Sequence, residues 1–214
     1  MRALAATAWE PVLSLGSWTL VGHAAPTPKH PAPPRDAAAV AMELLAAAKA
    51  LRSAPDRGLL FVPLGSRTAA RLAAGQLSLG SGPVPPGRIV WVLPGDGWDP
   101  AAAQQLLAAL PPGSVACLDG GPAGAPDWSR VAAATPRYVR IRRALTDRAV
   151  GDPAAKRALR LLCGAAAEWD AEVVAEVTGG PAALAAREAG ARYAHGPLWI
   201  LAGAKGVDGG GSGR

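Results

Sequence analysis

The segment 172–196, EVVAEVTGGPAALAAREAGARYAHG, contains the signals that decide the fold. It opens with an apolar run, 172–175, of strand length. Gly180-Pro181 then predicts a helix start, because proline fits the first helical turn, and Gly190 predicts the helix end. A further short strand is expected near residues 192–194. Strand, helix and strand in such close succession are typical of parallel strands joined by right-handed crossovers.

The same alternation continues toward the N-terminus. Asp99-Pro100 and Asp152-Pro153 each supply an N-cap followed by a first-turn proline. They predict helices over 101–110 and 154–168, beside predicted helices over 36–52 and 182–189. The apolar runs predict strands over residues 11–15, 18–22, 59–64, 88–93, 114–118, 138–141, 172–175 and 197–201.

This periodicity fits either an open doubly wound sheet or a closed (β/α)₈ barrel, and the spacing alone leaves both open. No Gly-rich phosphate loop follows the first predicted strand, which disfavours a dinucleotide-binding sheet.

Composition narrows the class of protein. The chain has 214 residues, half of them apolar, and a net charge of +6, which suits one domain with a substantial core. No basic stripe interleaved with aromatic residues appears, so no nucleic-acid partner is expected. Cys117 and Cys163 lie in apolar surroundings without CxxC spacing, typical of core residues in a reducing, cytoplasmic compartment. No apolar stretch is long enough to span a membrane, and neither a signal peptide nor a membrane partner is expected.

Several segments together resemble the EAL family, the cyclic di-GMP phosphodiesterases. In 172–196, Val173-Val174-Ala175-Glu176 is similar to the family's V-V-A-E strand end, and Tyr193-Ala194-His195-Gly196 is similar to its Tyr-Ala-Gln-Gly. Five further segments follow the family's order: 9–25 (WEPVLSLGSWTLVGHAA), 60–67 (LFVPLGSR), 88–96 (RIVWVLPGD), 115–124 (VACLDGGPAG) and 138–143 (YVRIRR).

The resemblance implies a TIM-like (β/α)₈ barrel whose first strand runs antiparallel to the others. It spans almost the whole chain, so we expect a single degenerate barrel domain over 1–206 and a disordered Gly/Ser tail over 207–214. The proline-rich stretch 26–34 runs directly into the first predicted helix, which indicates a shortened lid region.

The resemblance also implies a chemistry, metal-assisted hydrolysis of a phosphodiester, in which two hard cations need several carboxylate oxygens. Such ligands project from the C-terminal ends of barrel strands. Asp119 and Glu176 are the carboxylates retained at matching positions. The family's other metal-binding and water-positioning residues correspond here to His23 or a neighbour, Pro63, Val92 or a neighbour, Gly120, Arg140, Arg142, Gly179 and His195.

Asp119 and Glu176 are therefore expected to be vestigial ligand positions, with no catalytic residue, no metal and no cofactor. The phosphate-binding arginine of the family has no counterpart in residues 25–28. Arg67, Arg140 and Arg142 could still contact an anion. We favour the alternative that Arg140 or Arg142 forms a structural ion pair with Asp119.

These residues favour a catalytically inactive protein that acts as a regulatory module by binding another protein, with a link to cyclic di-GMP signalling. The partner is not identified by the sequence, and a homodimer is an open possibility. One alternative is a receptor that binds cyclic di-GMP without cleaving it. Others are an active phosphodiesterase whose motifs are misaligned and an unrelated α/β domain.

Overall fold

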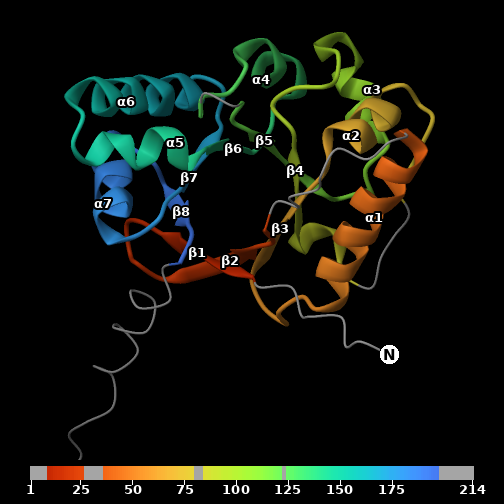
Figure 1. Cartoon of the computed structure of the whole chain (residues 1–214), viewed down its shortest axis with the longest axis horizontal. Helices are drawn as coiled ribbons and strands as arrows, with labels where there is room; N and C mark the ends of the chain where they lie inside the picture. The colour runs from red at the N-terminus through yellow and green to blue at the C-terminus, as the bar shows by residue number, and fades with distance from the viewer. Residues whose placement is uncertain (1–8, 27–35, 80–83, 122–123, 198–214) are drawn as a thin grey trace, which may run out of the picture.

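A computed structural model describes residues 9–26, 36–79, 84–121 and 124–197. Eight strands close into one barrel in the order β1 to β8, with helices on the outside (Figure 1). The strands are β1 Glu10–Ser14, β2 Leu20–Ala24, β3 Leu59–Pro63, β4 Ile89–Leu93, β5 Val115–Asp119, β6 Tyr138–Ile141, β7 Glu172–Glu176 and β8 Tyr193–His195. The predicted tail 207–214, nearly all of the predicted lid 26–34 and most of the predicted strand 197–201 lie outside the described residues.

The strand directions confirm the predicted architecture. β1 is antiparallel to both of its neighbours, β2 and β8, and every other neighbouring pair is parallel. The closed order excludes the open doubly wound sheet. The barrel closes between β1 and β8, and the closing strand is the short segment expected near 192–194.

The helices agree with the sequence where the start signals are strong. The helix α1, Asp36–Arg52, has the predicted bounds. Asp99 and Asp152 accept hydrogen bonds as N-caps, the first for the 3₁₀ turn η2, Pro100–Ala102, and the second for α6. The remaining helices are α2 Ser66–Ala73, α3 Ala103–Ala108, α4 Trp128–Ala134, α5 Arg143–Thr146, α6 Pro153–Ala167 and α7 Gly180–Ala189, with 3₁₀ turns η1 Pro86–Arg88 and η3 Arg148–Val150.

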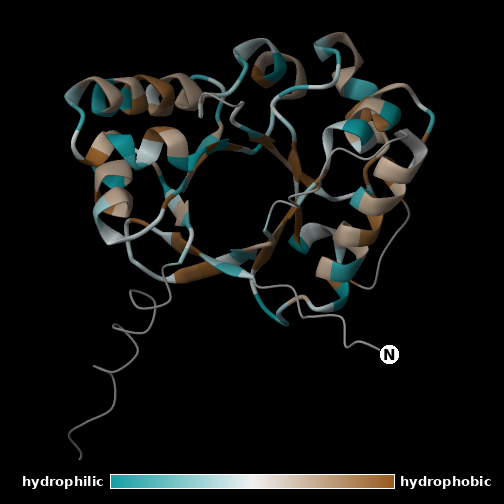
Figure 2. Cartoon of the chain, in the orientation of Figure 1, coloured by the Kyte–Doolittle hydropathy of each residue, from teal (hydrophilic) through white to brown (hydrophobic). Residues whose placement is uncertain are grey.

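Side chains alternate between the two faces of the sheet, which gives two apolar layers. Outward residues pack beneath the helices. Inward residues fill the barrel, chiefly Val12, Phe61, Val90, Val92, Cys117, Tyr138 and Val174. The strands accordingly carry much of the brown colour in Figure 2.

Both cysteines are free and buried, as predicted for core residues. Burial raises the pKa of the Cys117 thiol to about 12 and that of Cys163 to about 11, so both stay protonated. Within the described residues, no helix is long and apolar enough to cross a membrane.

Seven parallel strands end at the same end of the barrel, which we call the mouth. Because β1 runs the other way, its first residue is also at the mouth, where Glu10 is in register with Ala24 of β2. The mouth therefore collects the last inward residues of seven strands and the first of the eighth.

Candidate functional site

The mouth brings together most of the residues that the sequence singled out. Alternation along the strands points the following side chains inward at this end: Glu10, Ala24, Pro63, Val92, Asp119, Arg140, Glu176 and His195. Arg142 and Arg143 follow β6 directly. Three acidic and three basic side chains thus share the mouth.

The first ion pair joins β5 to β6. Arg140 donates from Nε to Oδ1 of Asp119 at 2.8 Å and from Nη2 to Oδ2 at 2.8 Å, a two-bond fork between buried groups. Arg142 Nε lies 3.4 Å from the same carboxylate. Burial is the largest single influence on the pKa of Arg140 and lowers it, but the charge of Asp119, the hydrogen bonds to it and further nearby acidic groups together raise that pKa. The predicted structural ion pair at Asp119 is confirmed.

The second ion pair joins β7 to α5. Arg143 donates to Oε1 of Glu176 from Nε at 2.8 Å and from Nη2 at 2.5 Å. Burial, the largest single influence, opposes ionisation of Glu176, yet the hydrogen bond from Arg143 and the charges of the surrounding basic groups together lower its pKa below the ordinary value. Thr146 of α5 also donates its hydroxyl to the backbone carbonyl of Glu176. An arginine therefore holds this carboxylate too, and it is Arg143, which was not among the predicted site residues.

The third contact joins β8 to β1, where the barrel closes. Nδ1 of buried His195 on β8 lies 3.5 Å from a carboxylate oxygen of Glu10 on β1. The contact lowers the pKa of Glu10. Burial lowers the pKa of His195 more than Glu10 raises it, so the imidazole is neutral near pH 7.

Gly120 follows Asp119 in a loop that turns back tightly over the end of β6. A Cβ at Gly120 would lie 2.6 Å from the carbonyl oxygen of Gly124 and 3.1 Å from that of Arg140. The Gly120 amide already donates to the Arg140 carbonyl at 2.8 Å. This backbone leaves no space for a side chain at the position where the resemblance implies a second aspartate.

The structure decides the position that was left open between His23 and a neighbour. His23 is paired with Leu60, which packs on the outer face of the sheet, whereas Ala24 belongs to the inward cluster. The inward residue at the end of β2 is therefore Ala24 and not His23, because the strand extends two residues further than predicted. Alanine has no side-chain oxygen either.

The other assigned positions lie at the same end of the barrel. Pro63 and Val92 are in register at the ends of β3 and β4, and neither side chain has a ligating oxygen. Arg67 lies in the first turn of α2, directly after β3. Gly179 precedes α7.

Glu10 and Arg143 were missed by the sequence analysis. A signal for Glu10 was available, because an antiparallel first strand places its first residue at the mouth. Arg143 is the second arginine of an Arg-Arg pair, and only the short turn into α5 directs it to Glu176.

These groups do not fit a two-cation centre. Each carboxylate at the mouth already faces a basic or imidazole group of the same chain, and a cation would have to displace those contacts. In the described part of the chain, no three His, Cys, Asp or Glu side chains gather closely enough to hold a metal ion.

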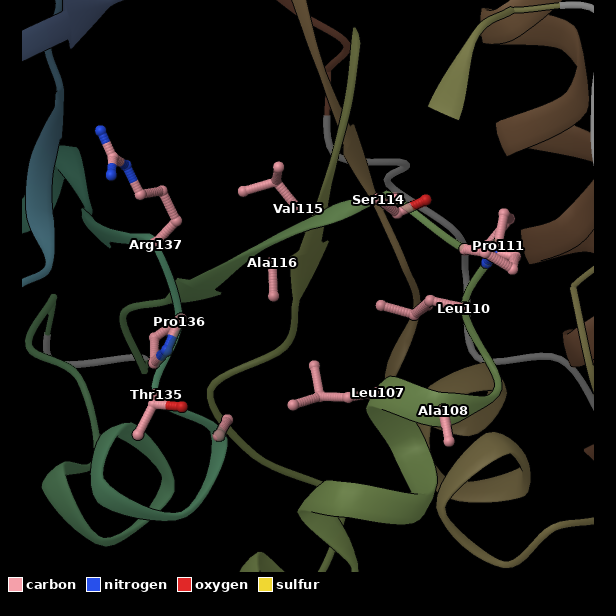
Figure 3. Close-up of a pocket in the computed structure, with 13 residues that line it drawn as sticks. Leu107, Ala108, Leu110, Pro111, Ser114, Val115, Ala116, Thr135, Pro136 and Arg137 are labelled. Atoms are coloured by element: carbon pink, nitrogen blue, oxygen red, sulfur yellow. The ribbon is translucent and has the colours of Figure 1, made fainter. Parts of the chain in front are cut away.

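A concavity lies at the end of the barrel opposite the mouth, between the C-terminal ends of α3 and α4. Its volume is about 460 Å³, and Figure 3 shows Leu107, Leu110 and Ala116 around it. Its polar groups have other partners: Ser114 accepts from Trp91, and Arg137 lies 3.5 Å from Glu172. The mouth is therefore the stronger candidate for a functional site.

No protein-family model matches the chain, and a search of curated proteins finds no match. Solved structures do share the fold. The PaMucR phosphodiesterase in complex with c-di-GMP aligns with a TM-score of 0.68 and 13% identity, over 91% of this chain and 89% of that chain. The EAL domain of Mycobacterium smegmatis DcpA aligns with a TM-score of 0.65 and 14% identity, over 90% and 89%.

The EAL enzyme Bd1971 in its cAMP-bound form gives a TM-score of 0.65 at 17% identity. The alignment covers 90% of this chain but 61% of that one, so this chain spans less than two thirds of that protein's length. The likenesses establish the EAL-type barrel fold. At these identities they do not establish an activity.

Proposed function

We propose that this chain is a catalytically inactive protein with an EAL-type barrel, which acts in cyclic di-GMP signalling as a protein-binding regulatory module. One observation carries the proposal: arginines of the chain itself hold the two mouth carboxylates that match the family's ligand positions. Asp119 is held by Arg140, and Glu176 by Arg143.

The physical reason is competition for the same oxygens. A two-metal hydrolase needs carboxylates free to bind two cations, which activate water and neutralise charge developing on the phosphate. Removing Arg140 from Asp119 would leave a guanidinium buried without its counter-ion, at a cost of about 3–5 kcal/mol. The backbone at Gly120, closed to any side chain, further supports the loss of the paired aspartate.

The scaffold itself is intact, which supports a role in binding. The barrel is closed, and the described helices are anchored by caps and ion pairs, such as Lys156 of α6 with Glu188 of α7 at 2.5 Å. A protein that works by presenting a surface needs this rigidity and does not need the metal ligands.

A second candidate, a receptor that binds cyclic di-GMP without cleaving it, is favoured by a separate observation. Arg142 and Arg143 remain 35% and 56% exposed at the mouth despite their acidic neighbours. Such guanidinium groups are suited to phosphate.

Two measurements on the purified chain separate these candidates. The first is calorimetric titration with cyclic di-GMP, and the second is product analysis after incubation with the dinucleotide and Mg²⁺ or Mn²⁺. We expect no heat of binding and no product above a control without protein. Binding at micromolar concentration without product would establish the receptor, and product above the control would refute the inactive module. In the receptor case, Arg142→Gln should weaken binding, whereas Arg148→Gln, at an exposed arginine of η3 that pairs with Asp152, should not.

A further inference from the structure

The outward side of α1 is apolar. We define the outer face of α1 as Ala38, Ala41, Met42, Leu45 and Ala48, which are spaced at three and four residues and so lie on one side of the helix. Leu45 is 63% exposed and Met42 40% exposed, and Ala38 and Ala41 are also exposed. The opposite side, with Ala39, Val40, Ala47 and Ala50, is buried.

The one acidic residue inside this stretch does not contribute to the outer face. Glu43 points toward α2 and accepts hydrogen bonds from the backbone amide of Thr68 at 2.9 Å and from its hydroxyl at 2.6 Å. Between Ala38 and Ala48, the outer face therefore carries no charge at all. A solvated helix normally presents charged or polar groups on this side.

The shape of the outer face suits another helix. Three alanines allow a neighbouring helix axis to come close, and Met42 and Leu45 supply side chains that can interdigitate with it. Helix-to-surface recognition reads apolar residues at i, i+3, i+4 and i+7, the spacing that this face offers. Figure 2 colours most of α1 on the hydrophobic side of its scale.

The size of the outer face argues against a second copy of the chain as the occupant. The helical segment from Ala38 to Ala48 is about 16 Å long, and a strip about 10 Å wide gives about 160 Å². A stable dimer needs about 800 Å² on each partner, so this strip supports a weaker, reversible contact.

Charge indicates the chemistry of the partner. The outer face ends at Lys49 and Arg52, both in the last turn of α1, and the chain has a net charge of +6. A second copy would bring the same positive charge, whereas a partner with acidic side chains would be attracted.

We propose that the outer face of α1 docks an acidic amphipathic helix of another protein. The apolar residues of that helix would pack on Met42 and Leu45, and its carboxylates would face Lys49 and Arg52. This inference rests on the proposed protein-binding function and specifies where and what the module binds.

The test uses the full chain and a fluorescently labelled peptide of about 18 residues, long enough to form a helix, with leucines at heptad spacing and glutamates elsewhere. Binding is followed by fluorescence anisotropy. A matched peptide carries lysine in place of each glutamate. The variants are Leu45→Glu, Leu45→Gln and the control Leu161→Glu, which changes a leucine of α6 that is 75% exposed. Figure 1 shows α1 and α6 on opposite sides of the barrel.

We expect the acidic peptide to bind at least about tenfold more tightly than the basic one. Leu45→Glu and Leu45→Gln should each weaken it about tenfold or more, while Leu161→Glu stays within about twofold. Circular dichroism of each variant checks that the fold is retained.

Three results would overturn the proposal. The first is an acidic peptide that fails to bind or binds equally to Leu45→Glu. The second is a dimer in sedimentation that Leu45→Glu dissociates, which would assign the face to a second copy. The third is co-sedimentation with phosphatidylcholine–phosphatidylglycerol vesicles that Leu45→Glu abolishes, which would assign the face to a membrane. Hydrolysis of cyclic di-GMP, measured separately, would refute the proposed function and leave these peptide results standing.

Discussion

At the scale of single residues, the mouth is governed by the cost of burying charge. Asp119 and Arg140 are both buried, and the two-bond contact with the other offsets much of the cost of burying each charge. Glu176, which is less enclosed, is held by the exposed Arg143. The two pairs therefore differ in energy although they look alike, since solvent screens the outer one and hardly reaches the inner one.

This difference predicts the effect of removing Asp119. The substitution Asp119→Ala strands the guanidinium of Arg140 and should lower the free energy of unfolding by about 3–5 kcal/mol, measured by urea denaturation. The double variant Asp119→Leu with Arg140→Met should recover much of that loss. Arg148→Ala removes an exposed ion pair with Asp152 and should cost less than about 1 kcal/mol. A loss at Asp119 as small as the one at Arg148 would contradict this account.

The site was only partly predictable from the residues. Asp119 and Arg140 could be paired because both end strands that a resemblance had aligned. The choice between His23 and a neighbour stayed open because a shift of one residue exchanges the two faces of a strand, and β2 has no clear alternation of polar and apolar residues to fix the register. Arg143 was missed because its contact with Glu176 depends on α5. This helix has only four residues and no side-chain N-cap, so its start could not be predicted from the sequence.

At the scale of elements, α1 positions α2. The N-cap residue of α2, Gly65, has no side chain, and Glu43 of α1 supplies the missing acceptor to Thr68. A Cβ at Gly65 would lie 1.9 Å from the Glu43 carboxyl carbon, so this glycine leaves the space that the carboxylate occupies. Glu43 thus satisfies a helix N-terminus far away in the sequence.

Removing this cap should destabilise the barrel without unfolding it. We expect Glu43→Ala to lower the free energy of unfolding by about 1–2 kcal/mol, because the amide of Thr68 loses its acceptor. Lys49→Ala, two turns further along α1, should change it by less than about 0.5 kcal/mol. Urea midpoints at neutral pH measure both, and equal effects of the two substitutions would contradict the capping role.

The strength of the local sequence signals explains which helices could be predicted. The predicted helix 36–52 is correct, because its run of alanine and leucine is long and contains no glycine or proline. α2 was missed because its cap comes from another helix, and α4 because it is only seven residues long. In α4 a local signal did exist, since Asp127 accepts from the Ser129 amide at 3.0 Å as an N-cap.

At the scale of the whole molecule, barrel closure depends on a short seam. β1 and β8 share three residue pairs, from Val12 with His195 to Ser14 with Tyr193. His195 is buried at the mouth end of that seam, where Glu10, Glu176 and Arg140 influence its charge. The protonation state of one side chain therefore bears on whether the barrel stays closed.

The seam predicts a stability that depends on pH. Burial lowers the pKa of His195 below its ordinary 6.5, so below about pH 6.5 the unfolded chain gains a proton that the folded chain resists. The free energy of unfolding should be steady above about pH 6.5 and fall as the pH decreases below it. Urea midpoints at about pH 7.5 and about pH 5.5 measure the loss.

His195→Gln should reduce this loss, because glutamine does not titrate. The pKa of His23 is also lowered by burial, so His23→Gln gives an independent contribution from outside the seam. A wild-type chain whose stability is the same at both pH values, or a loss unchanged by His195→Gln, would refute the assignment.

The crowded glycine at position 120 has a consequence for protein engineering. With 2.6 Å between a Cβ at residue 120 and the Gly124 carbonyl oxygen, the substitution Gly120→Asp requires the backbone at Gly124 to move. Placing a second carboxylate beside Asp119 by design would therefore begin with the backbone around Gly124 and not with the acid itself.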